Sequence, residues 1–100
     1  MAVIVIGQFR IPAERMGEAR PLMRKVMEAT RAEAGCIEYN FAEDVLDTGL
    51  IRVSEVWESR EHLNAHARSA HMAVWAEERA TLGLSGRAIT VFAADEGKAL

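Results

Sequence analysis

The chain has 100 residues, of which 50% are hydrophobic and 27% charged, so it matches one small globular domain and not a disordered segment. Its formal net charge is −3 and its basic residues are scattered singly, which excludes the basic surface that nucleic acid requires. The longest apolar run falls far short of the roughly 20 residues that cross a bilayer, no basic leader precedes it and only one cysteine is present, so we expect a cytoplasmic protein that contacts no membrane.

The first predicted element is a β-strand over residues 2–10, which is rich in β-branched residues and is followed by Pro12. Alternation predicts apolar side chains on both faces of this strand. The two sets are Val3, Val5 and Phe9 on one face and Ile4 and Ile6 on the other. The strand therefore needs cover on two sides, although the helices of so small a chain can supply only one.

An amphipathic helix is predicted over residues 19–34, where apolar side chains recur at helical spacing between charged ones. Pro21 is tolerated only in the first helical turn, so residues 13–18 should form a separate short turn. Gly35 then ends the helix.

Two further strands over residues 36–44 and 50–57 form a predicted hairpin, since turn residues 47–49 lie between them. The apolar face of the first of these strands holds Ile37, Tyr39 and Phe41. Two helical pieces follow, over residues 60–70 and 72–82. A last strand is predicted over residues 87–94, and we expect residues 95–100 to fray.

The order β, α, β, β, α, β predicts a single α+β domain over residues 1–100 with the ferredoxin-like fold. Its helices would cover one face of a four-stranded antiparallel sheet and leave the other face open. An uncovered apolar sheet face is most simply closed by a second copy of the chain, so we expect a homodimer.

Three blocks of the sequence are similar to the antibiotic biosynthesis monooxygenase family, which includes small quinol monooxygenases. The blocks are residues 33–39 (EAGCIEY), residues 55–59 (EVWES) and Leu63 with His66, and Ser69-Ala70-His71 follows at a similar spacing. The resemblance runs from Val3 to about Phe92. It implies a dimeric α/β barrel of two ferredoxin-like sheets packed face to face. Members oxidise polycyclic or quinol substrates without metal or flavin, degrade haem, isomerise small sugar-like signals or have no assigned reaction.

His66 is the first candidate for a catalytic residue, because it shares a helix face with Leu63 and Ala70 and should point toward the sheet. An oxygenase without a cofactor must deprotonate a phenol or quinol, so that the anion can pass an electron to dioxygen, and an imidazole can act as that base. The alternative is a structural histidine bonded to a neighbouring carboxylate or carbonyl.

Tyr39, Trp57 and Trp75 could form the walls of a pocket for a flat aromatic substrate, or belong to an ordinary core. Glu55 is predicted on the inner face of its strand, where it could orient His66 or form a salt bridge with Arg52 or Arg10. Asn40 could hold a substrate oxygen, against an ordinary surface role.

No cofactor is expected. His62 and His66 are four residues apart on one helix and could share a metal, but no third ligand is indicated, so we predict no metal site. The family's haem-degrading members need an axial histidine on the second helical piece, and residues 72–82 contain none. Nothing resembles a nucleotide-binding loop.

Three functions remain open at this stage. The first is a cofactor-independent monooxygenase of a small phenol, quinol or polycyclic aromatic, with His66 as base. The second is an isomerase or other enzyme of small metabolites that uses the same pocket without oxygen. The third is a dimeric binding protein without turnover.

Overall fold

The structure is a computed structural model that describes residues 1–100. Its elements, in chain order, are β1 (Ala2–Arg10), the 3-10 turn η1 (Ala13–Arg15), α1 (Met16–Arg31), β2 (Cys36–Glu43), β3 (Leu50–Trp57), α2 (Arg60–Ala67), α3 (Ala70–Thr81) and β4 (Ser85–Ala94). The predicted order of strands and helices is confirmed.

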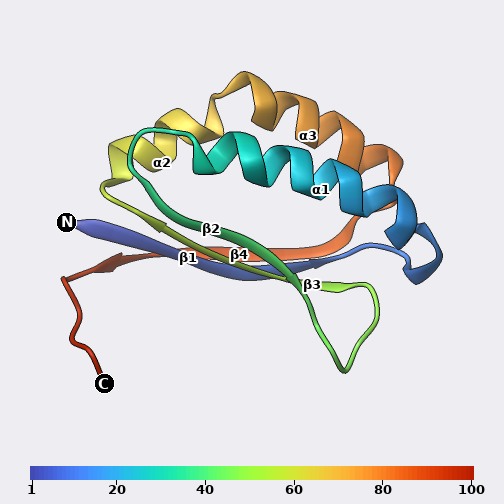
Figure 1. Ribbon diagram of the computed structural model, residues 1–100, viewed down its shortest axis with the longest axis horizontal. Helices are drawn as coiled ribbons and strands as arrows, with labels where there is room; N and C mark the ends of the chain where they lie inside the picture. The colour runs from blue at the N-terminus through green and yellow to red at the C-terminus, as the bar shows by residue number, and fades with distance from the viewer.

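The four strands form one antiparallel sheet in the order β2-β3-β1-β4, and all three α-helices lie on one side of it (Figure 1). This is the predicted ferredoxin-like arrangement. The register places Val5 of β1 between Glu55 of β3 and Val91 of β4. No helix combines the length and the apolar character needed to cross a bilayer.

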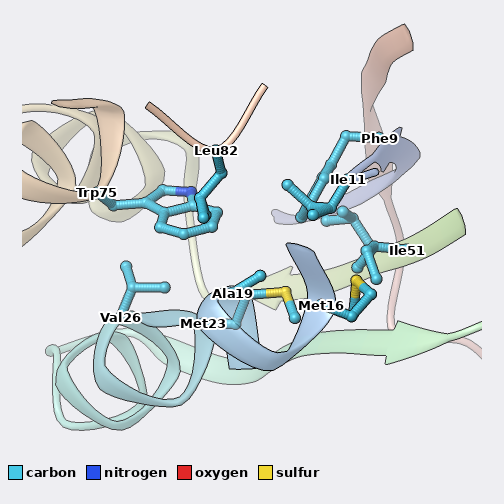
Figure 2. Close-up of a cluster of buried hydrophobic side chains, with 10 residues drawn as sticks. Phe9, Ile11, Met16, Ala19, Met23, Val26, Ile51, Trp75 and Leu82 are labelled. Atoms are coloured by element: carbon cyan, nitrogen blue, oxygen red, sulfur yellow. The ribbon is translucent and has the colours of Figure 1, made fainter. Parts of the chain in front are cut away.

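The main core lies between α1, α3 and the inner face of the sheet. Figure 2 shows Trp75 of α3 with Leu82 on one side of the cluster and the side chains that α1 contributes on the other. Phe9 and Ile51 of the two central strands complete it. Each large apolar side chain buried in this way contributes roughly 1.5–3 kcal/mol.

The first helix begins earlier than predicted. It starts at Met16, because Met16 and Ala19 are both buried in the core and extend the apolar face toward the N-terminus. Pro21 therefore lies in the second turn, where it removes the hydrogen bond to the carbonyl of Gly17. Both residues lie on the exposed side of the helix, so water can satisfy that carbonyl.

The predicted position of Ile37 on the inner face is wrong. The pairing of β2 with β3 shifts between Cys36 and Glu38, as in a β-bulge. Cys36 stands opposite Trp57 on the inner face, and Ile37 is exposed. Tyr39 returns to the inner face, as predicted, and is buried.

The outer face of the sheet is open and partly apolar. Ile6 and Phe92 are 50% and 55% exposed there, beside half-buried Ile4 and Val56. The loop between β2 and β3 projects on this side of the sheet (Figure 1), and it carries the almost fully exposed Val45 and Leu46. We propose that a second copy of the chain covers this face by two-fold symmetry.

In light scattering at micromolar concentration, the protein should have about twice the 11.1 kDa chain mass. Phe92→Glu should shift it to the monomer, because the substitution places a charge on the apolar outer face that the second copy would cover. Val74→Glu is the matched control, since Val74 is an exposed apolar residue on the helical side. A monomeric parent protein, or a Phe92→Glu variant that stays dimeric, would contradict the proposed interface.

Candidate active site

Two serines set the geometry of the helical layer next to the sheet. Ser59 caps α2, since its Oγ accepts a hydrogen bond from the backbone N–H of His62. Ser69 caps α3 by accepting from the N–H of Met72, and its hydroxyl donates to the carbonyl of His66 at 2.7 Å. This one side chain therefore joins the last turn of α2 to the first turn of α3.

The junction brings two histidines onto one carboxylate. Oε2 of Glu33 lies 2.6 Å from Nδ1 of His66 and 2.8 Å from Nε2 of His71. Glu33 stands in the turn that follows α1, and Gly35 completes this turn with a φ of +79°. A side chain at Gly35 would meet the ring of His62, so this glycine also allows α2 to approach the turn closely.

The carboxylate selects the form of the imidazole at His66. An ionised carboxylate only accepts hydrogen bonds, so the bond with Glu33 places the proton of neutral His66 on Nδ1 and leaves the lone pair on Nε2. No group of the chain forms a hydrogen bond with this Nε2. The only side-chain atoms that are both unpaired and fully buried are Thr30 Oγ1 and Glu78 Oε1, so Nε2 of His66 is not fully buried. A ligand can therefore reach the basic nitrogen of His66.

Two aromatic rings fix the plane of the His66 imidazole. The Trp57 ring lies 4.8 Å from it, centroid to centroid, and the Tyr39 ring meets it edge-on at 5.2 Å. Trp57 is held in turn by a 2.9 Å hydrogen bond from its Nε1 to Oε1 of Glu55. His66 itself is only 4% exposed. Its ring is thus oriented before any ligand arrives.

His66 lines a cavity of about 250 Å³ between the helices and the inner face of the sheet. Ten of its fourteen lining residues are hydrophobic, and the aromatic ones are Phe9, Tyr39, Phe41 and Trp75. The polar ones are Glu55, His66, Arg79 and Arg87. A cavity of roughly 150 Å³ accepts benzene, so this larger one has room for a substituted aromatic ligand.

The acidic groups that face the cavity are shifted toward their protonated forms. Burial raises the pKa of Glu55, although the hydrogen bond from Trp57 and the charges of His66 and Arg87 partly oppose the change. Burial, together with the charge of Glu55, also raises the pKa of Tyr39 far above its usual range. Tyr39 therefore remains a neutral phenol that can donate a hydrogen bond and cannot serve as a base.

The donor atoms of Glu33, His66 and His71 all lie within 4.8 Å of one another, so these three residues are the set that could hold a metal ion. Ligands of a tetrahedral zinc are about 3.4 Å apart when their bonds are about 2.1 Å long. Oε2 of Glu33 is closer than that to both nitrogens, at 2.6 and 2.8 Å, which fits hydrogen bonds. His62 is not part of this set, because its Nδ1 lies 2.7 Å from Ser59 Oγ. The absence of a bound metal stays a prediction.

The sequence profile of the antibiotic biosynthesis monooxygenases matches residues 2–78, which is more than half of the chain. The chain belongs to the antibiotic biosynthesis monooxygenase family. The family resemblance of the sequence blocks is thereby confirmed. They contribute Glu33, Glu55, Trp57, His66 and His71, which the fold gathers around one end of the cavity.

Solved structures agree with this assignment. A Deinococcus radiodurans protein named for the same family superimposes with a TM-score of 0.91, at 26% identity over 98% of this chain and 97% of that one. Rv0793 of Mycobacterium tuberculosis superimposes with a TM-score of 0.81, at 30% identity over 99% and 100% of the two chains. The uncharacterized protein sll1783 of Synechocystis is 28% identical over 76 residues, and the chain spans about half of its length.

The cavity collects four of the six predicted site residues, namely Tyr39, Glu55, His66 and Trp75. Trp57 lies behind His66 and does not line the cavity. Asn40 lies on the outer face of the sheet, where it accepts from Arg31 and donates to Ser54 Oγ, so its predicted contact with substrate has no support in this geometry.

The predicted roles of Glu55 are corrected. The carboxylate that orients His66 belongs to Glu33, while Glu55 accepts from Trp57. The alternative salt bridges are also wrong, because both proposed arginines pair elsewhere. Arg52 pairs with Asp44, and Arg10 pairs with Asp47.

Four functional candidates had no role in the sequence analysis: Glu33, His71, Arg79 and Arg87. For His71, the signal was Ser69 between the two helical pieces. A sharp turn at this serine brings the last turn of α2, with His66, close to the first turn of α3, with His71. Alternation in the last strand places Arg87 on the same inner face as Ile89 and Val91, which is an unusual place for a charge. Glu33 had no such signal, because its partners are distant in sequence, and no local pattern distinguished Arg79 from the other charged residues of its helix.

Glu55→Gln should change how stability depends on pH. Because folding raises the pKa of Glu55 above its ordinary 4.5, the protonated carboxyl favours the folded state, and this contribution is lost as the pH rises through the folded-state pKa. Glutamine stays neutral and can still accept from Trp57. The variant should therefore melt at a higher temperature than the parent at pH 8, and this difference should shrink toward pH 4.

Glu58→Gln is the control, since Glu58 is exposed just beyond the end of β3. Thermal melts of the three proteins between pH 4 and pH 8 would check the prediction. A melting difference for Glu55→Gln that is constant across this range would show that Glu55 is not a buried acid whose pKa is raised.

Proposed function

We propose that this protein is a cofactor-independent monooxygenase that oxidises a small phenol, quinol or hydroxylated polycyclic aromatic with dioxygen. The observation that carries the proposal is the 2.6 Å bond between Glu33 and His66, which leaves Nε2 of His66 as an accessible base in a mostly apolar cavity. Family membership supports it, because the family is named for this type of reaction.

The first step would be transfer of the phenolic proton to Nε2 of His66. Glu33 stabilises the imidazolium that results, because its carboxylate accepts from Nδ1–H in both charge states. The phenolate is electron-rich and gives one electron to dioxygen. The resulting pair of radicals combines at a ring carbon that bears hydrogen, and the imidazolium returns its proton to the peroxide oxygen. The O–O bond then breaks, the ring carbon loses its proton, and the departing water leaves a carbonyl there. In total, a phenol and one dioxygen give a quinone and one water, and the substrate supplies every electron.

The walls suit such a substrate. Tyr39 and Trp75 present aromatic surface to a planar ring, and the nitrogen of Trp75 and the hydroxyl of Tyr39 have no hydrogen-bond partner within the chain. Water is largely displaced from an apolar cavity once a ring fills it, which strengthens the interaction between His66 and Glu33. The same walls would protect a radical pair from side reactions.

His66→Ala should lower oxidation by about 10²-fold or more, the usual scale for loss of a general base, and should leave the fold largely intact. The measurement is oxygen consumption with a panel of phenols, quinols and naphthols, together with incorporation of ¹⁸O from ¹⁸O₂ into the product. His62→Asn is the matched control, because His62 lies on the same helix but outside the cavity.

Melting curves on the same samples separate loss of catalysis from loss of folded protein. A folded His66→Ala variant that oxidises substrate at the parent rate would refute the role of His66. Conversion that depends on His66 and proceeds equally well without oxygen would instead identify an isomerase.

A further inference from the structure

Two arginines line the cavity without forming an ion pair. Arg79 of α3 and Arg87 of β4 both contribute to its wall, and neither forms an ion pair or a side-chain hydrogen bond within the chain. Four of the other eight arginines pair with carboxylates: Arg10 with Asp47, Arg15 with Glu18, Arg20 with Glu43 and Arg52 with Asp44. The cavity wall therefore carries two guanidinium groups that form no ion pair, against one carboxyl group, that of Glu55.

The two charges also act on each other. Arg79 is half-buried, and its burial together with the nearby charge of Arg87 lowers its pKa, although a guanidinium stays protonated at neutral pH. The one acid that faces the same cavity is Glu55, whose Oε1 is engaged by Trp57. Placing two like charges beside apolar walls is unfavourable unless an anion joins them.

The arginines enter the cavity at the end opposite the histidines. Arg79 is eight residues beyond His71, which is about 12 Å along α3. On the sheet, Glu55 is level with Val91, and Arg87 stands four residues from Val91, about 13 Å along β4. The long side chains of the two arginines span part of these distances, and the aromatic ring of a bound ligand would span the rest.

We propose that Arg79 and Arg87 form a carboxylate-binding subsite, and that the substrate is an aromatic acid whose hydroxyl group faces His66. The planar fork of a guanidinium matches a carboxylate through paired N–H donors. The phenolic end of this substrate rests on the proposed function, whereas the acidic end rests on the two unpaired arginines alone. Arg87 is exposed, so the acid group lies at the open end of the cavity and the ring lies inside.

Binding of 4-hydroxybenzoate and of its neutral isostere 4-hydroxybenzamide to the full chain tests the subsite. Calorimetry or NMR titration at pH 7 should show that the acid binds at least about tenfold more tightly than the amide, as expected for a charge-assisted contact. Arg79→Gln and Arg87→Gln should each remove most of this preference and leave the affinity of the amide unchanged. Arg24→Gln, at an exposed and unpaired arginine of α1, should change neither affinity.

Equal affinities for acid and amide, absence of binding by both probes, or an acid preference that survives both substitutions would overturn the subsite. The amide also controls for folding, because a misfolded variant would lose both ligands, and circular dichroism on the same samples identifies that case. If a glutamine variant misfolds, the lysine variant of the same arginine replaces it in the test. Arg79→Lys and Arg87→Lys keep the charge but not the fork, so each should retain only part of the preference for the acid. Full retention of this preference would overturn the fork contact.

This test measures no turnover, so it can fail separately from the proposed function. Arginine-dependent binding of the acid without oxidation of any phenolic acid would leave the subsite standing and refute the monooxygenase. Oxidation of neutral quinols without any preference for acids would support the monooxygenase and refute the subsite.

Discussion

One carboxylate oxygen joins the elements that surround the candidate active site. Oε2 of Glu33 accepts from His66 at the end of α2 and from His71 at the start of α3, while Glu33 itself belongs to the turn between α1 and β2. Three helices and the edge of the sheet thus meet at one atom. A half-buried carboxylate with two strong hydrogen bonds is stable there, and losing either partner would leave polar atoms unsatisfied. The same contact decides which nitrogen of His66 is basic, so structure and chemistry depend on one interaction.

The cavity derives its chemical polarity from this arrangement. Its basic nitrogen lies where His66 is held between Trp57 and Tyr39, and Arg79 and Arg87 enter its wall from positions farther along α3 and β4. Ten of its lining residues are hydrophobic. In the proposed complex, the two sets of polar groups orient the substrate and the apolar wall excludes water from its ring. Fold alone would not specify this, because one fold can carry several chemistries.

Local patterns were enough to predict the strands, the open sheet face and the inward direction of His66. Residues 2–10 are rich in β-branched residues and residues 50–57 follow a clear turn, and the predicted limits of both strands agree with the structure. The prediction failed where tertiary contacts override local preference. Burial of Met16 extends α1 past the start that Pro21 suggested, and the bulge beside Cys36 turns Ile37 outward. The role of Glu33 could not be predicted either, because 33 and 38 residues separate it from its partners.

The tautomer of His66 tests the central claim most directly. Two-bond ¹H–¹⁵N correlation NMR of the imidazole groups distinguishes a protonated nitrogen from one that carries a lone pair. With His66 neutral, the account predicts a proton on Nδ1 and a lone pair on Nε2, and it predicts that Glu33→Gln weakens this preference because an amide can also donate to Nδ1. A proton on Nε2 of His66 in the parent protein would contradict the account, since that nitrogen could not then accept a proton from a substrate.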